Sequence, residues 1–582
     1  MTLFVAVTLI CLLPCLHASL PVMETVNLTG IHDWGNRFEG MLVFPIVEDV
    51  YGWEVTVHFN YPVILQRNAE TTINRISADN RTYVLVNKLS DGSKHNHTTT
   101  SMTIIGRYNR LTSDPPIAAT AALVNLIHDG QVTPSTPPAV ASEKYNYAEV
   151  LEKSILFYEA QRSGKLPSTN RIPWRGDSAL TDHGQNGEDL SGGWYDAGDH
   201  LKFGFPLAGS VSMLAWGLIE FKDAYAATGQ LDNMYDCIRW PLEWLMKAHT
   251  GRNELYVQVG DGDLDHHFWG RPEDMTMARP SYKITEDKPG SDVAAEYAAA
   301  MASGYIAFKD KEPAFAAKLL THAREIYAFA LEYNGTYSKS LPQSAAQFYG
   351  SSDYDDEMCW GGAWLYLATG EDKYLTHSKN YNHPGTSWGQ SWGNKDIGCK
   401  VLLHNVTGED RYAADITGTF TNWMPGGNVP YLNSGLALRN EWGSLRHTAN
   451  MAFIALVAAE NGLNSAEYRA WAKSQIHIAL GDTGRSFVVG FGVNPPSHPH
   501  HRSSSCPMMP APCSQEALSR SGSNPHTLYG GLVGGPSREG SYKDNRQDYQ
   551  QNEVACDYNA GFQSAVADTC LYLHIKLSGC TL

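Results

Sequence analysis

Two aspartates stand three residues apart in the segment GGWYDAGDHLKF, residues 192–203. Glycines and aromatic residues surround Asp196 and Asp199, so the backbone can turn sharply and both carboxylates can face the same small volume. The same spacing also suits a helix cap or a solvated turn, because aspartate commonly serves both. A metal pair is a third interpretation, although the further ligands of a dedicated site are missing nearby. Taken alone, the pair leaves these alternatives open beside catalysis.

A second polar cluster, YKDNRQDYQQNEVACDYNAGF, occupies residues 542–562. Glu553 stands there among apolar and amide neighbours, and burial would raise its pKa and keep it protonated as an acid. The upstream aspartate pair would stay ionised as a base. One protonated carboxyl facing one ionised carboxylate in an aromatic-lined site is the pair of groups that glycoside hydrolysis uses.

A third cluster, SFVVGFGVNPPSHPHHRSSS, covers residues 486–505 and offers His500, His501 and Arg502 on a proline-rich loop. Histidine and arginine donate hydrogen bonds well to sugar hydroxyls. A zinc site is the alternative, but His498, His500 and His501 lack the i, i+4 helical spacing of a common zinc motif.

The elements that must position these clusters are helices. From residue 144 onward, amphipathic segments such as PLAGSVSMLAWGLIEFKDAYAATG alternate with long loops dense in Trp, Tyr, His, Gly and Asp. Helix stop signals close most of these segments. The pattern predicts an all-α toroid or solenoid over residues 144–582, in which the loops on one side form the site.

The first part of the chain has a different character. Residues 1–19 are typical of a signal peptide, because a short apolar run is followed by the small residues Ala18 and Ser19. Residues 20–130 alternate polar and apolar positions, which predicts a small antiparallel β domain. Residues 131–143 are rich in Pro, Thr and Ser and are typical of an extended linker.

Composition narrows the range of partners. The 582 residues carry a formal net charge of −17, which disfavours nucleic acid or an anionic membrane as a partner and suits an uncharged substrate. Eight cysteines remain after the leader, so disulfides are allowed in a secreted protein, but their pairing stays open. Five N-x-[ST] sequons, at Asn27, Asn80, Asn96, Asn334 and Asn405, agree with secretion and glycosylation.

Taken together and in this order, the three clusters resemble glycoside hydrolase family 9, the cellulases with an (α/α)6 barrel, over roughly residues 144–580. The resemblance implies inverting hydrolysis of β-1,4-glucan. It implies that Glu553 is the general acid, that Asp199 is the general base, and that Asp196 helps to hold the attacking water. An inverting enzyme needs room for that water, with about 6.5 to 9.5 Å between the acid and base carboxyls.

The same resemblance assigns supporting roles. His500 and Arg502 match a sugar-contacting pair beside the cleavage point, and Asp544 matches the other acid of the C-terminal signature, one layer behind the reacting groups. His447 stands where family members usually carry Tyr. Aromatic faces stack on the apolar faces of glucose rings. The expected binding-cleft residues are His266, Trp269, Trp388, Trp442, Arg446 and Tyr558.

The segment YGSSDYDDEMCW resembles the calcium site of the family. The chemistry needs no cofactor, so calcium here would be structural. Many calcium-binding members carry a further Asp where this chain has Gly393 and then Asn394. The candidate oxygen ligands are Ser352, Asp353, Asp356 and Glu357.

The first domain resembles a carbohydrate-binding module of family 2, a β-sandwich. Trp53 corresponds to a core tryptophan and Trp34 to one member of a surface strip that binds cellulose. Arg67 stands where a second strip Trp is expected. Binding to soluble glucan or chitin, or a glycosylated cap without binding, therefore remain alternatives.

The sequence as a whole predicts a secreted, monomeric endo-β-1,4-glucanase whose partner is a β-1,4-glucan. An exo-β-glucosaminidase or another β-glycosidase is an alternative within the enzymes, and it would need a blocked or charged pocket. A catalytically inactive glucan-binding protein is the alternative from another class. The retained Asp196, Asp199 and Glu553 argue against it.

Overall fold

The computed structural model describes residues 26–33, 37–46, 53–61, 63–65, 71–76, 81–87, 98–107, 116–125 and 144–577. The chain folds as two compact units, residues 1–139 and residues 140–581. Within the described part of the chain, no helix combines the length and apolarity that a membrane crossing requires.

The N-terminal unit contains two antiparallel sheets. In the first, the strands follow the order β1 (Val26–Asn27), β9 (Ala119–Asn125), β4 (Trp53–Phe59), β7 (Thr82–Asn87) and β6 (Thr71–Ile76). In the second, the order is β2 (Thr29–Asp33), β3 (Arg37–Ile46), β8 (Thr98–Arg107) and β5 (Ile64–Leu65).

Both sheets contribute to one hydrophobic core. Val55 and Val57 of β4 are buried, whereas His58 is exposed, which is the two-residue period of a sheet with one covered face. Phe38 and Phe44 of β3 belong to the same buried cluster. The alternation predicted from the sequence is therefore present in these strands.

Several N-terminal predictions fall on residues that the structure does not describe. The signal peptide, the linker at residues 131–143, Trp34 and Arg67 lie outside the described residues. Trp53 begins β4, but its side chain is not among those described. The comparison with a family 2 module thus stays a prediction.

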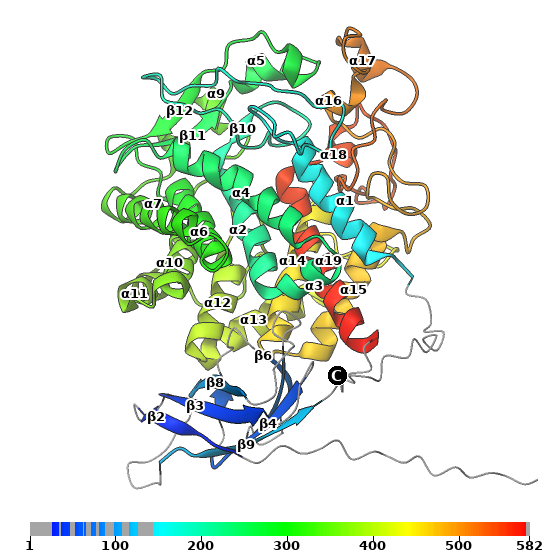
Figure 1. The fold of residues 1–582 in the computed structure, drawn as a ribbon. Helices are drawn as coiled ribbons and strands as arrows, with labels where there is room; N and C mark the ends of the chain where they lie inside the picture. The colour runs from blue at the N-terminus through cyan, green and yellow to red at the C-terminus, as the bar shows by residue number, and fades with distance from the viewer. Residues whose placement is uncertain are drawn as a thin grey trace, which may run out of the picture. The chain divides into compact units, whose positions relative to one another are not determined.

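The second unit is built from helices (Figure 1). Its longer helices are α1 (Tyr147–Ala160), α2 (Gly204–Glu220), α4 (Leu231–Ala248), α6 (Ser291–Phe308), α7 (Pro313–Glu332), α10 (Asp355–Thr369), α11 (Asp372–Tyr381), α12 (Asp396–Thr407), α13 (Asp410–Trp423), α14 (Ser444–Glu460), α15 (Ser465–Leu480) and α19 (Cys556–Leu577). Six of them form a closed inner ring in which each packs on the next: α2, α6, α10, α12, α14 and α19, which returns to α2. The alternate helices pack outside this ring, so the unit is an (α/α)6 barrel, as predicted.

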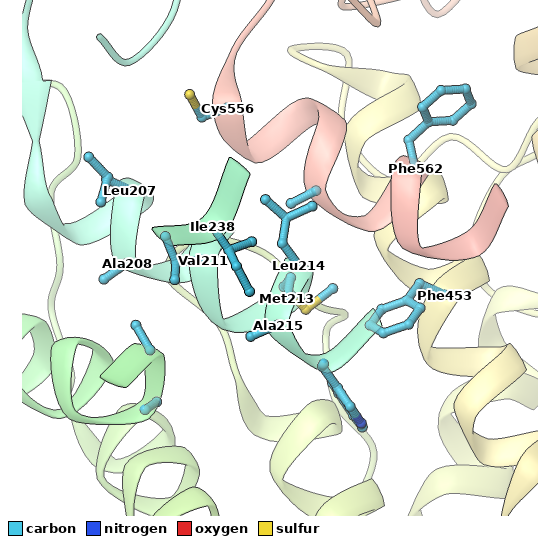
Figure 2. Close-up of a cluster of buried hydrophobic side chains, with 14 of the residues drawn as sticks. Leu207, Ala208, Val211, Met213, Leu214, Ala215, Ile238, Phe453, Cys556 and Phe562 are labelled. Carbon is cyan, nitrogen blue, oxygen red and sulfur yellow. The ribbon is translucent and has the colours of Figure 1, made fainter. Parts of the chain in front are cut away.

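Burial distinguishes the two layers of helices. The inner helices α2, α6 and α14 are buried on nearly all sides, whereas the outer helices α4, α7 and α13 bury only one face. Leu214 of α2, Ile238 of α4, Phe453 of α14 and Phe562 of α19 belong to one buried cluster (Figure 2). This packing fixes the ends of the helices from which the site loops leave.

Short elements gather at one end of the barrel (Figure 1). They are the three-stranded sheet β10 (Lys202–Phe203), β11 (Leu255–Val259) and β12 (Ser281–Ile284), the helices α5 (Gly262–His266), α8 (Tyr337–Ser340), α9 (Gln343–Ala346), α16 (Arg502–Ser505), α17 (Glu516–Ser519) and α18 (Tyr549–Asn552), and the 3-10 helix η2 (Pro272–Asp274). The short helix α3 (Lys222–Ala227) follows α2. The loops at this end carry the three motif segments.

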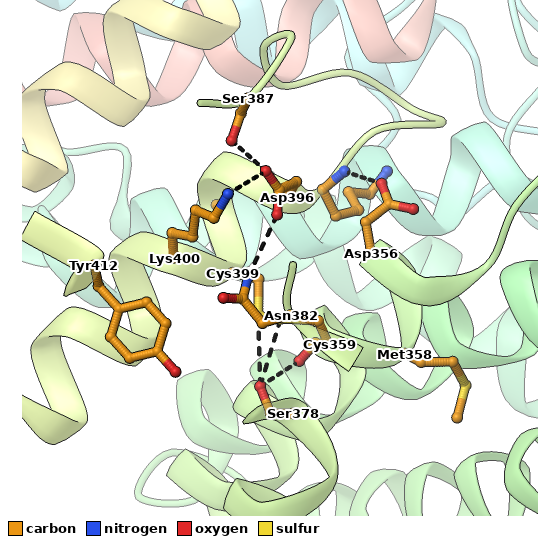
Figure 3. The surroundings of a disulfide bond; sticks show 12 residues. Asp356, Met358, Cys359, Ser378, Asn382, Ser387, Asp396, Cys399, Lys400 and Tyr412 are labelled. Carbon is orange, nitrogen blue, oxygen red and sulfur yellow. Dashed lines mark hydrogen bonds and ion pairs between the residues drawn. A yellow bond between two sulfur atoms is a disulfide. The ribbon is translucent and has the colours of Figure 1, made fainter. Parts of the chain in front are cut away.

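Two disulfides are present among the described residues. Cys359 of α10 is bonded to Cys399 of α12, and Ser378 of α11 donates a hydrogen bond to the Cys359 carbonyl at 2.8 Å (Figure 3). Cys506 is bonded to Cys513, which closes a short loop after α16. Cys237 and Cys556 are buried free thiols. The side chains of Cys570 and Cys580 lie outside those described.

Candidate active site

The segments that hold Asp196 and His500 are packed backbone to backbone. Arg502 N–H donates to the Gly198 carbonyl at 3.0 Å. A Cβ atom on Gly198 would lie 2.0 Å from the His500 carbonyl oxygen, so only glycine permits this approach. The glycine between the two aspartates therefore has a structural cause: it lets two motif loops meet.

The Glu553 segment joins the same junction. His500 N–H donates to the Asn552 carbonyl at 2.8 Å, and Cys556 N–H donates to the Asp196 carbonyl at 2.8 Å. The structure thus brings the segment 192–203 together with two segments near the C-terminal end, 486–505 and 542–562.

Asp196 is buried at the base of the site. Tyr349 donates a hydrogen bond to its Oδ2, while Oδ1 accepts no hydrogen bond from any described residue. Burial raises the pKa of Asp196 well above its usual value, and the nearby charges of Asp199 and Asp557 raise it further. This differs from the expectation that both aspartates stay ionised. Burial favours the protonated form of Asp196.

Asp199 is less enclosed, with 11% of its side chain exposed. Its Oδ1 accepts from Ala197 N–H at 3.2 Å, and its Oδ2 lies 3.8 Å from Nε2 of His266. Burial lowers the pKa of His266, but the hydrogen bond and charge of Asp199 outweigh burial and raise that pKa above its usual value. The pair favours the protonated, charged form of His266.

Glu553 lies half-buried at the start of the segment before α19. Trp442 Nε1–H donates to its Oε2 at 3.2 Å, and the Tyr558 hydroxyl donates to the same oxygen at 3.1 Å. Burial raises the pKa of Glu553 to about 7, against these two donors and with a further contribution from the charge of Asp199. A glutamate that keeps its proton near neutral pH can act as a general acid.

A buried layer supports the acid from behind. Arg446 donates to Asp557 Oδ2 at 2.9 Å and to the Trp442 carbonyl at 3.3 Å, and its guanidinium lies 4.9 Å from the ring centre of Tyr558. Arg446 therefore contacts both donors of Glu553, Trp442 and Tyr558, and helps to hold them in place. His447 Nε2 lies 3.1 Å from Arg446 and accepts its hydrogen bond, because arginine can only donate.

His500 faces the site in its neutral form. Its Nδ1–H donates to the Arg546 carbonyl at 2.6 Å, and burial lowers its pKa to about 4. With the proton fixed on Nδ1, the Nε2 atom can only accept a hydrogen bond. This corrects the expected direction: His500 would accept from a sugar hydroxyl instead of donating to it.

Two other motif residues, Arg502 and Asp544, make contacts that hold the motif loops in place. Arg502 is buried and paired with Asp265. Asp544 accepts hydrogen bonds from the backbone N–H groups of Ser497 and His498, at 2.9 and 3.0 Å. Burial alone would raise the pKa of Asp544, but these donors lower it. Asp544 therefore anchors the loop that carries His500, and its supporting role in the reaction stays a prediction.

The expected aromatic contacts divide into two groups. Trp442 and Trp388 are 44% and 37% exposed, so part of each ring is open to a sugar, and the Arg439 guanidinium lies over the Trp388 ring at 4.8 Å from its centre. Trp269 and Tyr558 are buried, and the Trp269 ring packs edge-on against His500 with ring centres 5.1 Å apart. His266 is partly exposed beside Asp199.

Three further aromatic residues lie at the site and are not among those predicted from the sequence motifs. They are Tyr349, which holds Asp196, Trp392, whose ring packs on Tyr349, and the exposed Tyr549 beside Trp442. Tyr549 lies within the C-terminal signature and could have been selected for that reason. Tyr349 is the first residue of the segment assigned to calcium, but spacing does not connect it to Asp196.

The candidate calcium residues are not equivalent. Asp353 Oδ1 accepts from the backbone N–H groups of Tyr354 and Asp355, and Asp356 Oδ2 accepts from Lys395 N–H. Ser352 is exposed. Glu357 is buried, and its Oε1 has no hydrogen-bond partner among the described residues. That unpartnered oxygen, and the excess of carboxylates around it, fit a cation.

A different set of side chains meets a simple distance criterion for a metal. Ligand atoms of Asp199, Asp265 and His266 lie within 4.8 Å of one another, and no other such group of three or more occurs in the described residues. Arg502 already neutralises Asp265 in this set.

Comparisons with known proteins identify the family of the chain. The model of Glycosyl hydrolase family 9 matches residues 147–566. Endoglucanase B of Cellulomonas fimi is 48% identical over 455 residues, which cover 75% of this chain and 43% of that relative. The chain thus spans less than half the length of this relative.

Two solved structures share the fold. The endoglucanase of the termite Nasutitermes takasagoensis superposes with a TM-score of 0.72 at 49% identity, over 74% of this chain and 99% of that one. Endoglucanase CelQ from Clostridium thermocellum, complexed with cellotetraose, superposes with a TM-score of 0.66 at 38% identity, over 74% and 71%. Because the family match spans residues 147–566, which include all three motif segments, the chain belongs to glycosyl hydrolase family 9 and is a glycoside hydrolase.

Proposed function

We propose that the chain is an endo-β-1,4-glucanase that cleaves internal bonds of cellulose and related β-glucans by an inverting, single-displacement mechanism. The observation that carries this proposal is the contrast between Glu553, whose pKa is raised to about 7, and Asp199, which lies against His266. The relatives named endoglucanases support the substrate class.

In this mechanism Glu553 supplies the proton. Both hydrogen bonds that it accepts from described residues go to Oε2, from Trp442 and Tyr558, so Oε1 remains for the substrate. The proton passes to the glycosidic oxygen as the bond from that oxygen to the anomeric carbon breaks. Glu553 is left ionised, and the leaving sugar carries a new hydroxyl.

Asp199 activates the water on the opposite face of the sugar. It takes one proton from the water as the water oxygen bonds to the anomeric carbon, so the configuration at that carbon inverts. Asp196, held by Tyr349, orients the same water through its unpartnered Oδ1. Exchange with solvent then moves the proton from Asp199 and restores the proton on Glu553.

The exposed rings of Trp442 and Trp388 would stack on glucose rings and define neighbouring subsites. His500 would accept a hydrogen bond through Nε2 from a hydroxyl beside the cleavage point. A partly exposed row of such groups suits cleavage within a chain.

We also infer the wider setting of the enzyme. The leader and the sequons support secretion, and the described sheets support a β-sandwich module that binds glucan. Structural calcium would be held by Glu357 with Asp356 and would balance their charge, without a part in the reaction. We expect a monomer.

The test is incubation of the full chain with carboxymethyl cellulose while viscosity and reducing ends are followed. An endo-acting enzyme lowers the viscosity early, whereas an exo-acting β-glycosidase releases reducing ends with little loss of viscosity. A chain that binds the polymer but releases no ends would instead be a binding protein.

A further inference from the structure

A short apolar loop stands at the His500 side of the site. Residues 507–512 read Pro-Met-Met-Pro-Ala-Pro, and we call this segment the apolar lip. Residues 508–512 are all exposed, and the side chains of Met508 and Met509 are 51% and 50% exposed. A run of five consecutive exposed apolar residues is unfavourable in water unless it has a partner.

The apolar lip is held in place by its surroundings. The Cys506–Cys513 disulfide closes its base. Arg271, which is buried, donates to the carbonyls of Pro507 and Ala511, each at 2.7 Å. A loop tied at three points loses little conformational entropy when a ligand binds to it.

The lip is continuous with the candidate active site. It begins one residue after α16, whose Ser505 accepts a hydrogen bond from Trp269 Nε1 at 2.9 Å. Trp269 packs directly on His500, and Arg271 lies two residues further along the same segment. The lip therefore adjoins the buried contacts that hold His500 in place.

The chemistry of the lip suits the faces of glucose rings. Segment 507–512 carries no charged or hydrogen-bonding side chain, so it can cover the axial C–H groups of a sugar without competing for its hydroxyls. Methionine side chains are flexible and polarisable, and they adapt to successive rings along a polymer.

We propose that the apolar lip binds the part of a long β-1,4-glucan chain that extends beyond the cleavage point on the His500 side. This inference rests on the proposed function. It makes the lip a determinant of chain length: polymers reach it, and the shortest oligosaccharides do not.

The test compares two double variants of the full chain. Met508→Gln with Met509→Gln keeps the side-chain volume but makes the lip polar, and Met508→Leu with Met509→Leu keeps it apolar. Kinetics are measured on cellotriose and on carboxymethyl cellulose. We expect the glutamine variant to show an about fivefold higher KM on the polymer than the leucine variant, from about 40 Å² of lost apolar contact. The kcat on the polymer, and both constants on cellotriose, should agree within about twofold.

Other results would overturn the inference. Equal KM values on the polymer would show that the lip does not contact glucan, while cleavage by the wild type would leave the proposed function intact. An equal loss on cellotriose would place the effect at the catalytic groups. A dimer of the wild type that the glutamine variant loses in sedimentation velocity would identify a second copy as the occupant. Wild-type protein that cleaves no β-1,4-glucan would remove both the proposed function and the role of the lip.

Discussion

Glu553 and Glu357 are both glutamates that burial drives toward the protonated form, yet their surroundings differ. Glu553 lies half-buried, with two neutral donors on one oxygen and exposed Trp442 beside it. Glu357 is enclosed, and its neighbours are the carboxylates of Asp356, Asp292 and Glu296 and the ammonium of Lys395.

Burial raises the pKa of both glutamates, but the consequence differs between the two positions. At Glu553, moderate burial sets the pKa to about 7, and the proton remains transferable to a ligand. At Glu357, burial and Asp356 raise the pKa well above its usual value, and Lys395 compensates only part of the negative charge. We expect changes at Glu553 to alter turnover, and changes around Glu357 to alter stability.

The largest expected effect is on turnover. Glu553→Gln removes the transferable proton, so kcat on cellotetraose should fall about 10³-fold or more, while binding of the oligosaccharide is kept. The free energy of unfolding should not decrease, because a neutral amide replaces a carboxyl that burial disfavours when ionised. Initial rates check the turnover, isothermal titration checks the binding, and urea unfolding checks the free energy of unfolding. Glu539→Gln, at an exposed carboxyl, is the matched control, and a similar loss of kcat in that control would invalidate the interpretation.

The contrasting change is among the charged groups around Glu357. Lys395 is buried and lies 3.3 Å from Glu296. Lys395→Met leaves the surrounding carboxylates without their cation, and we expect a loss of about 3 to 5 kcal/mol in the free energy of unfolding. Urea unfolding measures this loss, with the exposed Lys373→Met as control. A loss below about 1 kcal/mol would mean that the cluster is already neutral.

A smaller effect on kcat is expected from a change beside Asp196. Tyr349→Phe removes the hydrogen bond to Asp196 Oδ2 and leaves the ring packed against Trp392. We predict an about tenfold lower kcat with little change in KM, because the orientation of the water is affected more than substrate binding. An unchanged kcat would show that Asp196 needs no such support.

The pH dependence of the rate follows from Glu553. The acid must be protonated at the start of each turnover, and its pKa is raised to about 7. The rate should therefore be retained below that value and fall about tenfold for each pH unit above it. A profile of kcat against pH tests this, and a rate that stays constant to pH 9 would contradict the assignment of Glu553 as the acid.

The smallest expected effect concerns calcium. Because the folded-state pKa of Glu357 is raised, its protonation stabilises the fold at low pH, and this stability is lost as pH rises through the folded-state pKa. With a chelator present, Glu357→Gln should lose less stability than the wild type as pH rises. Added calcium should raise the melting temperature of the wild type by a few degrees and leave Glu357→Gln unchanged. An equal increase in both proteins would place the calcium elsewhere.

The helical architecture could be predicted because its signals are local. Amphipathic period and stop signals mark helices such as α7 and α15, and the alternation in β4 marks a strand. No single segment of the sequence determines the order in which the inner helices close into a ring. It depends on contacts such as that of α19 with α2, and the family resemblance supplied it.

The sequence motifs point to residues of the site, but they say less about the protonation states and hydrogen-bond partners of those residues. Glu553 was expected to carry a raised pKa, and the structure gives the cause as burial. The sequence does not contain the contact of Tyr349 with Asp196, since 153 positions separate them. Nor does it contain the bond that fixes the proton of His500 on Nδ1, because the acceptor is a backbone carbonyl.

The most direct test of the account is the configuration of the first product. Cellotetraose is incubated with the full chain, and the anomeric protons of the released sugars are followed by NMR before mutarotation. A single displacement by Asp199-activated water with Glu553 as acid predicts the α-anomer as the initial product, absent in Glu553→Gln. Initial release of the β-anomer would contradict this account, because it requires a covalent intermediate at a carboxylate.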